Sequence, residues 1–330
     1  MGTENLALID LHLHLDGSLS VWTVRQLAEM QSILIPDSET ELLKMLQVSD
    51  SCKDLNEYLE KFDFPCSLLQ SEEAITTAVS NLKQELADQG LLYAEIRFAP
   101  QLHTLHGLTQ DQVVKAAICG LHCNDFKANL ILCCMRGDNN RTQNLETVRI
   151  AGRYLGQGVC AVDLAGAEAL FPTDYFEELF REASNLDVPY TIHAGEADGP
   201  RSVRTALRYG AKRIGHGVRS VEDEALLASL ARQGITLELC PTSNLNTNIF
   251  DRISAYPLPK LLNSGVKVTI NTDNMTVSGV TLESELEKVR AAFDLTKEQM
   301  KMLAHNAADA SFADEEVKQW LRGEIAARFA

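Results

Sequence analysis

The stretch TIHAGE, residues 191 to 196, decides how the chain is interpreted. An apolar run rich in β-forming residues, Val188 to Ile192, leads directly into His193, and Glu196 follows two small residues later. That order predicts a buried strand that carries a histidine at its C-terminal end, with a carboxyl group on the loop just beyond it.

Three other segments end in the same way, each with a histidine or an aspartate after an apolar run. They are HLHLDGS at 12–18, GHG at 215–217 and TINTDN at 269–274. On a strand, His12 and His14 share one face because they are two residues apart. We therefore predict a single metal site assembled at strand ends that lie far apart in the sequence.

The spacing of the β-like runs predicts the architecture. Eight such runs alternate with helical patterns, at residues 6–11, 91–100, 128–137, 158–166, 188–196, 211–217, 234–244 and 265–274. This α/β alternation favours a (β/α)8 TIM barrel with its site at the C-terminal strand ends. An open doubly wound sheet is the alternative, but no glycine-rich GxGxxG turn follows the first run.

A mostly helical insertion, about residues 20–88, separates the first two runs. Because an insertion at the C-terminal end of a barrel strand lies over the mouth, we expect it to act as a lid. Within it, one apolar stripe follows helical spacing: Leu55, Tyr58, Leu59 and Phe62. The whole chain, residues 1–330, is expected to form one domain, since α/β barrels reach this length as single units.

Composition narrows the possible partners. The chain has 330 residues, of which 45% are hydrophobic, and a formal net charge of -16. An acidic protein repels phosphate backbones and anionic lipid, so we expect neither a nucleic-acid nor a membrane partner. No signal peptide and no apolar stretch of about 20 residues is visible, so we expect a cytoplasmic protein. No sequence signal fixes an oligomeric state.

Eight cysteines are present, and none forms a CxxC pair. Most lie in apolar runs, which favours reduced, buried thiols. Cys119 and Cys123, followed by Cys133 and Cys134, could form a metal cluster, but we prefer core positions on a helix and the next strand.

Three neutral imidazoles and one carboxylate are a donor set typical of a catalytic zinc ion. We therefore predict that His12, His14, His193 and Asp273 bind one Zn²⁺ per chain. In a closed barrel the first and eighth strands are neighbours, and the fifth lies opposite. Zinc lowers the pKa of bound water from about 15.7 to about 7, which makes hydroxide available at neutral pH. Asp273 can also accept a hydrogen bond from that water.

Two further side chains are candidates for catalysis. His216, on the strand after His193, is expected to orient the hydroxide and stabilise its charge. A structural histidine between glycines is the alternative. Glu196 can be held protonated beside a metal ion and an apolar pocket, and would then act as a general acid. A solvated loop carboxylate is the competing interpretation of Glu196.

These segments closely resemble the adenosine deaminase family. HLHLDGS, DLAG, HAGE, GHG, LCPTSN and NTD are signature segments of that family, in its order, over about residues 8 to 280. The resemblance implies a zinc-dependent barrel that hydrolyses a purine nucleoside, adenosine or 2′-deoxyadenosine, to the inosine product and ammonia in purine salvage. It implies zinc binding by His12, His14, His193 and Asp273, proton donation to purine N1 by Glu196, hydroxide contact by His216, and substrate contacts by His14, Asp16, Gly166 and Asn274. Gly166 would donate its backbone N–H to purine N3, and Asp16 would lie near the ribose. The apolar stripe looks like the family's wall above the sugar, with ordinary core packing as an equal alternative.

Two positions depart from the family pattern. The family often has two consecutive aspartates followed by proline after the last strand, whereas here Asp273 is followed by Asn274 and Met275. An asparagine amide can donate to an unprotonated purine N7, so we expect Asn274 to keep that contact. Ala167 stands where the family often has an acidic residue, which affects supporting hydrogen bonds rather than chemistry.

Other functions fit parts of the pattern. A deaminase of adenine or of a 5′-substituted adenosine would use the same fold and metal site. A two-metal hydrolase of esters or amides would often carry a lysine at the end of the fourth strand, and VCAVDLAG at 159–166 has none. A catalytically silent binding barrel is the remaining alternative, although all the proposed ligands and the acid are present.

Overall fold

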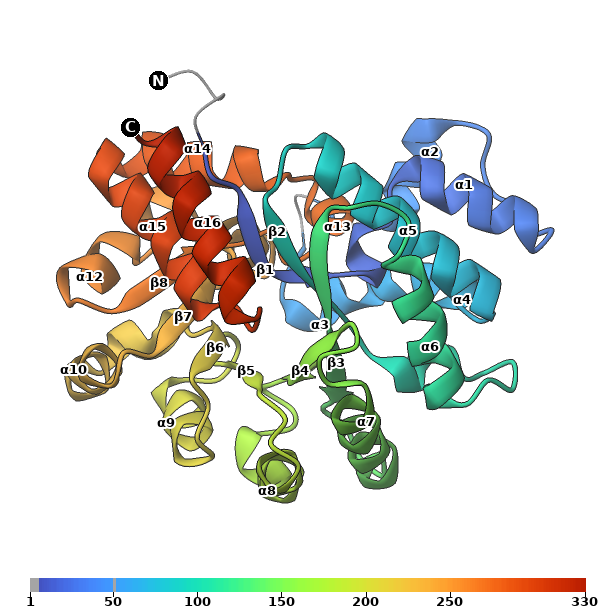
Figure 1. Cartoon of the computed structure of the whole chain (residues 1–330), viewed down its shortest axis with the longest axis horizontal. Helices are drawn as coiled ribbons and strands as arrows, with labels where there is room; N and C mark the ends of the chain where they lie inside the picture. Colours follow the sequence, from blue (N-terminus) through green and yellow to red (C-terminus); the bar gives the residue numbers. More distant parts are fainter. Residues whose placement is uncertain (1–5, 50–51) are drawn as a thin grey trace.

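The computed structural model describes residues 6–49 and 52–330, and at its centre is a ring of eight parallel strands (Figure 1). The strands are β1 (Ile9–His14), β2 (Tyr93–Phe98), β3 (Lys127–Met135), β4 (Val159–Ala165), β5 (Thr191–Ala194), β6 (Arg213–His216), β7 (Thr236–Leu239) and β8 (Lys267–Ile270). Nearly all their residues are buried, as expected for parallel strands with helices outside and packed side chains inside. The predicted (β/α)8 fold is confirmed.

Two four-stranded sheets make up the ring. Their orders are β1-β2-β3-β4 and β5-β6-β7-β8. Single bridges join the sheets at both seams, Val162 to Tyr190 between β4 and β5, and a second between β1 and the segment after β8. At the second seam the His14 N–H donates to the Asp273 carbonyl at 2.7 Å, and the Asp273 N–H donates to the His12 carbonyl at 2.8 Å. Predicted site residues therefore close the ring.

Helices cover the outside of the ring. They are α1 (Val21–Met30), α2 (Glu39–Leu46), α3 (Leu55–Leu59), α4 (Asp63–Leu68), α5 (Glu72–Asp88), α6 (Gln110–Gly120), α7 (Arg141–Tyr154), α8 (Glu177–Asn185), α9 (Pro200–Arg208), α10 (Glu224–Gln233), α11 (Pro241–Asn246), α12 (Leu258–Asn263), α13 (Met275–Ser278), α14 (Leu282–Phe293), α15 (Lys297–Ala310) and α16 (Glu315–Arg328). Short 3₁₀ helices lie between them: η2 (Asp16–Ser18), η3 (Glu60–Phe62), η4 (Pro100–His103), η5 (Thr173–Phe176), η6 (Val218–Glu222) and η7 (Ile253–Ala255). Helix α15 packs against both β1 and β8 and so covers the seam between them (Figure 1). No helix in the described ranges has the length and apolar composition needed to cross a membrane.

The insertion between β1 and β2 folds as helices α1 to α5, most of which lie to one side of the ring (Figure 1). Its α3 region is held to the C-terminal end of the barrel. The Tyr58 hydroxyl forms a hydrogen bond with Ser278 Oγ at 2.7 Å, and the Val48 N–H donates to the Val277 carbonyl at 3.0 Å. The insertion thus has the position of a lid, and its closure stays a prediction. The main hydrophobic core cluster includes residues from β1 to α16, and the single domain stays a prediction.

The first strand extends further than the sequence pattern indicated. It spans Ile9–His14 rather than residues 6–11, because its pairing with β2 continues to His14, opposite Arg97. His12 and His14, which follow the apolar run, are therefore part of β1, and the strand places both side chains in the site.

The prediction for the clustered cysteines was wrong in part. Cys133 and Cys134 are buried in β3, but Cys119 and Cys123, at the end of α6 and just after it, are exposed. None of the four belongs to a group of possible metal ligands among the described residues. All eight cysteines are free thiols.

Charged side chains fill the middle of the barrel. Glu95 and Arg97 from β2, Arg213 from β6 and Glu238 from β7 are each at most 1% exposed. Arg213 contacts Glu95 Oε2 at 2.5 Å and Glu238 Oε1 at 2.6 Å, and Arg97 contacts Glu238 Oε2 at 2.9 Å. Opposite charges therefore compensate one another where water is excluded.

We expect Arg213→Ala to destabilise the fold by about 3–5 kcal/mol, because it leaves Glu95 and Glu238 without their shared cation. The shift in the urea denaturation midpoint, followed by circular dichroism, measures this loss. Arg204→Ala is the control: Arg204 is 45% exposed and pairs with Asp223 at 2.5 Å, and losing such a pair costs less than about 1 kcal/mol. Equal shifts in the two variants would contradict the expectation.

Candidate active site

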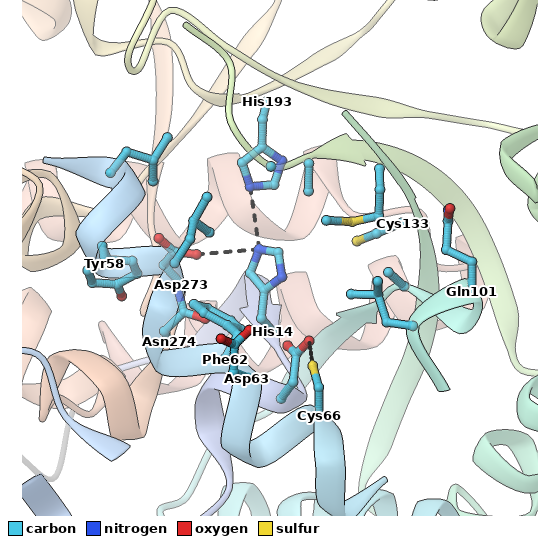
Figure 2. Close-up of a pocket in the computed structure, with 18 of the residues that line it drawn as sticks. His14, Tyr58, Phe62, Asp63, Cys66, Gln101, Cys133, His193, Asp273 and Asn274 are labelled. Atoms are coloured by element: carbon cyan, nitrogen blue, oxygen red, sulfur yellow. Dashed lines mark hydrogen bonds and ion pairs between the residues drawn. The ribbon is translucent and has the colours of Figure 1, made fainter. Parts of the chain in front are cut away.

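A cavity of about 450 Å³ opens at the C-terminal ends of the strands, within the usual size range of small-molecule sites (Figure 2). Eight predicted site residues line it: His14, Asp16, Gly166, His193, Glu196, His216, Asp273 and Asn274. The remaining one, His12, is fully buried, with its ring centre 5.4 Å from that of His14 and 4.5 Å from that of His193. The structure thus brings all the predicted site residues together.

Four of these side chains place nitrogen and oxygen atoms at metal-ligand spacing. His14 Nε2 lies 3.4 Å from both His193 Nε2 and Asp273 Oδ1 (Figure 2), and His12 Nε2 also lies 3.4 Å from Asp273 Oδ1. Tetrahedral bonds of about 2.0–2.1 Å would separate the ligand atoms by about 3.3–3.4 Å. His12 Nε2 is buried with no hydrogen-bond partner in the described part of the chain. This donor set therefore fits an ion such as zinc.

The surroundings favour the metal-binding protonation states at three of the four proposed ligands. Burial lowers the pKa of His14 and His193, which favours neutral imidazoles. Burial also acts to lower the pKa of His12, but its contacts with Asp273 and Glu238 raise it overall. Burial alone would raise the pKa of Asp273, but its contacts with His12 and the other imidazoles hold that pKa well below its usual range. Neutral nitrogen and ionised oxygen donors are what metal binding requires.

Two buried carboxylates contact the Nδ1 atoms of the His12 and His193 imidazoles. His12 Nδ1 lies 2.9 Å from Glu238 Oε2, and His193 Nδ1 lies 2.8 Å from Asp163 Oδ2. Each contact keeps the Nδ1 of the ring inside the protein and turns its Nε2 towards the other ligands. Arg97 links the two carboxylates, since its guanidinium lies 2.9 Å from each of them.

A second group of possible ligands overlaps the first: His12, His216, Cys240 and Asp273. Burial raises the pKa of the Cys240 thiol well above its usual range, and the thiolate, not the thiol, is the metal ligand. His216 Nε2 also lies 3.6 Å from Glu196 Oε2. We therefore favour the group that contains His14 and His193.

Two of the seven described non-glycine residues with positive φ angles lie at this site. His216 and Asp273 have positive φ angles of 58° and 60°, a conformation that costs about 1–3 kcal/mol for residues other than glycine. It brings Asp273 Oδ2 to 3.9 Å from His216 Nε2. Gly195 has a φ of 73°, and a Cβ there would lie 2.5 Å from Val203 Cγ2, so only glycine fits in the turn before Glu196.

Glu196 is buried, with 4% of its surface exposed. Asn244 Nδ2 donates to its Oε1 at 3.3 Å. Burial raises the pKa of Glu196 well above its usual range, and the nearby carboxylates of Asp273 and Glu168 add to this effect. A carboxyl group that keeps its proton near neutral pH can serve as a general acid. The alternative of a solvated loop carboxylate is therefore excluded.

The remaining predicted contacts face the rest of the cavity. Asp16 Oδ2 lies 3.5 Å from Cys66 Sγ, and burial raises the pKa of Asp16 to about 6. The Oδ1 of Asn274 is buried without a hydrogen-bond partner in the described ranges, which leaves hydrogen-bonding capacity for a ligand. Gly166 directly follows β4 and has a φ of 105°.

The apolar stripe of the insertion forms one wall of the same cavity: Leu55, Tyr58, Leu59 and Phe62. Tyr58 is 2% exposed and also packs with Cys52 and Val277. The stripe therefore both packs against the barrel and lines the cavity.

The sequence alone did not point to the residues that support the site. Asp163 and Glu238 lie within buried apolar strands, and a charged residue in such a run needs a buried partner. That was the available signal for these two. Arg136 and Glu168, in the loops after β3 and β4, carried no comparable signal, because their partners lie in other parts of the chain: Arg136 binds Thr173 and His193, and Glu168 binds the loop after β5.

The closed parallel barrel, with imidazoles and carboxylates gathered at its C-terminal mouth, is typical of a (β/α)8 enzyme with a metal centre. The model of the family described as adenosine deaminase matches residues 7–328. The chain belongs to the adenosine deaminase family.

Individual relatives agree with this assignment. An adenosine deaminase from Haemophilus ducreyi is 47% identical over 338 residues, covering 100% of this chain and 98% of the relative. The crystal structure of an adenine deaminase from Arthrobacter aurescens is similar, with a TM-score of 0.89, 27% identity and 98% of each chain covered. The apo structure of the N6-methyl-AMP deaminase from Arabidopsis thaliana has a TM-score of 0.85 and 26% identity, covering 98% of this chain and 97% of that one.

Asp163→Asn should weaken metal binding by about 10- to 100-fold, because asparagine keeps the size but removes the charge beside His193 Nδ1. Titration of metal-free protein with zinc, in competition with a chelating dye, measures the affinity. Asp174→Asn is the control, since Asp174 pairs with the exposed Arg208 at 3.0 Å, away from the cavity. An unchanged zinc affinity in Asp163→Asn would refute the supporting role.

Proposed function

We propose that the chain catalyses the zinc-dependent hydrolytic deamination of adenosine, and of 2′-deoxyadenosine, to the inosine product and ammonia, as a reaction of purine salvage. One observation carries the proposal: a buried carboxyl group, Glu196, lies beside a four-residue metal-ligand set in one cavity, and its burial raises its pKa well above the usual range. The match to the family over residues 7–328 and the Haemophilus relative support the choice of substrate.

The proposed chemistry divides the tasks among these residues. His12, His14, His193 and Asp273 would hold one zinc ion per chain, and the bound ion would lower the pKa of its water to about 7. Glu196 donates its proton to purine N1, which draws electron density out of the ring and makes C6 electrophilic. Asp273 accepts a hydrogen bond from the attacking water and His216 orients it, which their 3.9 Å separation allows. As the water oxygen bonds to C6, one of its two protons passes to the amino nitrogen and the other restores the Glu196 carboxyl group. The C6–N bond then breaks, ammonia leaves, and the C6=O bond of the product forms.

The substrate contacts are proposed from the cavity lining. Gly166 donates its backbone N–H to purine N3, Asp16 lies near the ribose, and His14 lies between the metal site and the substrate. Asn274 donates from its amide Nδ2 to purine N7. Its Oδ1 has no hydrogen-bond partner in the described structure, so turning the amide to present Nδ2 breaks no hydrogen bond at Oδ1. The insertion of about residues 20–88 closes over this arrangement as a lid.

The lining favours a nucleoside over a free base or a nucleotide. Beyond the metal ligands, Asp16, Asp63 and Ser67 supply polar groups that suit sugar hydroxyls. No Lys or Arg is among the described residues that line the cavity, so a 5′-phosphate would meet carboxylates instead of cations. We therefore rank adenine and 5′-phosphorylated adenosines below adenosine, although enzymes named for such substrates share the fold.

The eight free thiols suit a reducing compartment, which we propose to be the cytoplasm.

Ultraviolet assays of the zinc-loaded protein test the substrate assignment. Adenosine and 2′-deoxyadenosine should have kcat/KM values at least about tenfold above those of adenine and N6-methyl-AMP, because only a nucleoside matches both the polar and the uncharged parts of the cavity. Equal or greater turnover of adenine would remove adenosine as the substrate. A metal-replete protein inert to all of these compounds would favour a silent binding barrel.

Glu196→Gln should lower kcat by about 100-fold or more while zinc and substrate binding persist, because the amide can donate a hydrogen bond to N1 but is not acidic enough to transfer a proton to it. Steady-state kinetics with adenosine and elemental analysis for zinc measure the two properties. Glu222→Gln, an exposed glutamate paired with Arg219, should keep the wild-type kcat. A wild-type kcat in Glu196→Gln would refute the acid assignment.

A further inference from the structure

The loop that carries Glu196 is held by a buried carboxylate with no part in the proposed chemistry. Glu168 lies three residues beyond β4 and is 1% exposed. Its two oxygens accept four successive backbone N–H groups, from Gly195 at 2.7 Å, Glu196 at 3.0 Å, Ala197 at 2.8 Å and Asp198 at 2.9 Å. The Ser202 hydroxyl donates to the same carboxylate at 2.5 Å. Five donors thus converge on one anion, and such charge-assisted hydrogen bonds are the strong ones.

The start of the same segment is held by a different group. Arg136 is 6% exposed and donates through Nη2 to the carbonyl of His193 at 2.6 Å and to Thr173 Oγ1 at 2.9 Å. The metal-ligand end of the segment is therefore fixed by Arg136, whereas the acid end is fixed by Glu168. The two supports are linked by the hydrogen bond between Thr173 Oγ1 and Ser202 Oγ at 2.7 Å, but a change at Glu168 leaves the bonds of Arg136 to His193 and Thr173 in place.

Glu168 is not among the residues that line the cavity, so its effect on the reaction passes through Glu196, by the loop that Glu168 holds and by the charge with which it helps to raise the pKa of Glu196. Its bond to the N–H of Glu196, and those to the residues on either side, fix the peptide planes that aim the Glu196 side chain. That side chain then meets Asn244 at 3.3 Å and His216 at 3.6 Å. Rotating any of these peptides would break a hydrogen bond to the buried carboxylate and leave a buried donor unsatisfied.

We propose, building on the acid role proposed above for Glu196, that Glu168 is the positioning residue for the general acid. It binds the backbone of residues 195–198 and thereby holds the Glu196 carboxyl group where it reaches purine N1. Its effect on the rate is exerted only through Glu196.

Glu168→Gln tests the proposal at constant side-chain size. It replaces one oxygen by an NH₂ group. That NH₂ group must then face the N–H or O–H groups whose hydrogen bonds the oxygen accepted. A misplacement of about 1 Å can cost about 100-fold in rate, so we expect kcat for adenosine to fall at least about tenfold. KM should change by less than about threefold, and zinc content should stay at one ion per chain, because Arg136 still holds His193.

The decisive measurement is a double-mutant cycle with Glu196→Gln. In that background Glu168→Gln should lower kcat by less than about twofold, because the acid whose position it controls is already gone. The same tenfold loss in both backgrounds would overturn the proposal, and so would loss of zinc from Glu168→Gln. Wild-type turnover of adenosine is measured first: an inactive wild type refutes the proposed function, whereas an active wild type with additive losses refutes only the role of Glu168.

Two further variants keep the test interpretable. Ser202→Ala removes a single donor to Glu168 and should fold even if Glu168→Gln does not. It should lower kcat a few-fold in the wild-type background and leave it unchanged in the Glu196→Gln background, and additive losses here would overturn the proposal equally. Asp314→Asn is the matched control, since Asp314 also accepts a backbone N–H, from Val317 at 2.8 Å at the start of α16, and does not line the cavity. It should keep the wild-type kcat, and a tenfold loss there would show that kcat does not report on the loop.

Discussion

A chain of alternating charges through the middle of the barrel is the constraint on which the site depends. Arg213 lies between Glu95 and Glu238, and Arg97 lies between Glu238 and Asp163. Two of these carboxylates contact metal-ligand candidates: Glu238 contacts His12, and Asp163 contacts His193. None of these charges can be removed without stranding another where water is absent. The imidazoles are therefore oriented from inside the barrel, and the mouth loops are left to determine what binds.

The acid is held by different means from the metal ligands. His12 and His193 are fixed by side-chain carboxylates, whereas Glu196 is fixed through its own backbone, whose N–H groups converge on Glu168. The strained backbone at His216 and Asp273 belongs to the same arrangement, since positive φ angles bring these side chains beside Glu196 and the ligand set. Buried hydrogen bonds and ion pairs supply the stability that such conformations cost.

The sequence predicted the parts of this protein that depend on short-range pattern. Apolar runs ending in His193 and His216 gave both the barrel and the location of the site, because strand ends in a closed barrel must meet. Strand limits were less accurate: Asp273 lies three residues beyond β8, where it forms the bridge to β1. The role of Glu168 could not be predicted in this way. Glu168 follows β4, whereas the N–H groups that it binds lie in the loop after β5, and no local sequence pattern indicates that contact. The exposure of Cys119 was missed for a related reason, since it depends on which face of α6 the neighbouring helices leave uncovered.

The seams of the ring have a consequence for how the protein is assembled. Each seam is a single bridge, so the eight strands behave as two half-barrels with few backbone bonds between them. The ligand set is divided evenly: His12 and His14 belong to the first half, and His193 and Asp273 belong to the second. An ion bound by all four residues would hold the two halves together. The complete ligand set exists only after the halves have joined. Metal binding and the joining of the halves are therefore thermodynamically linked.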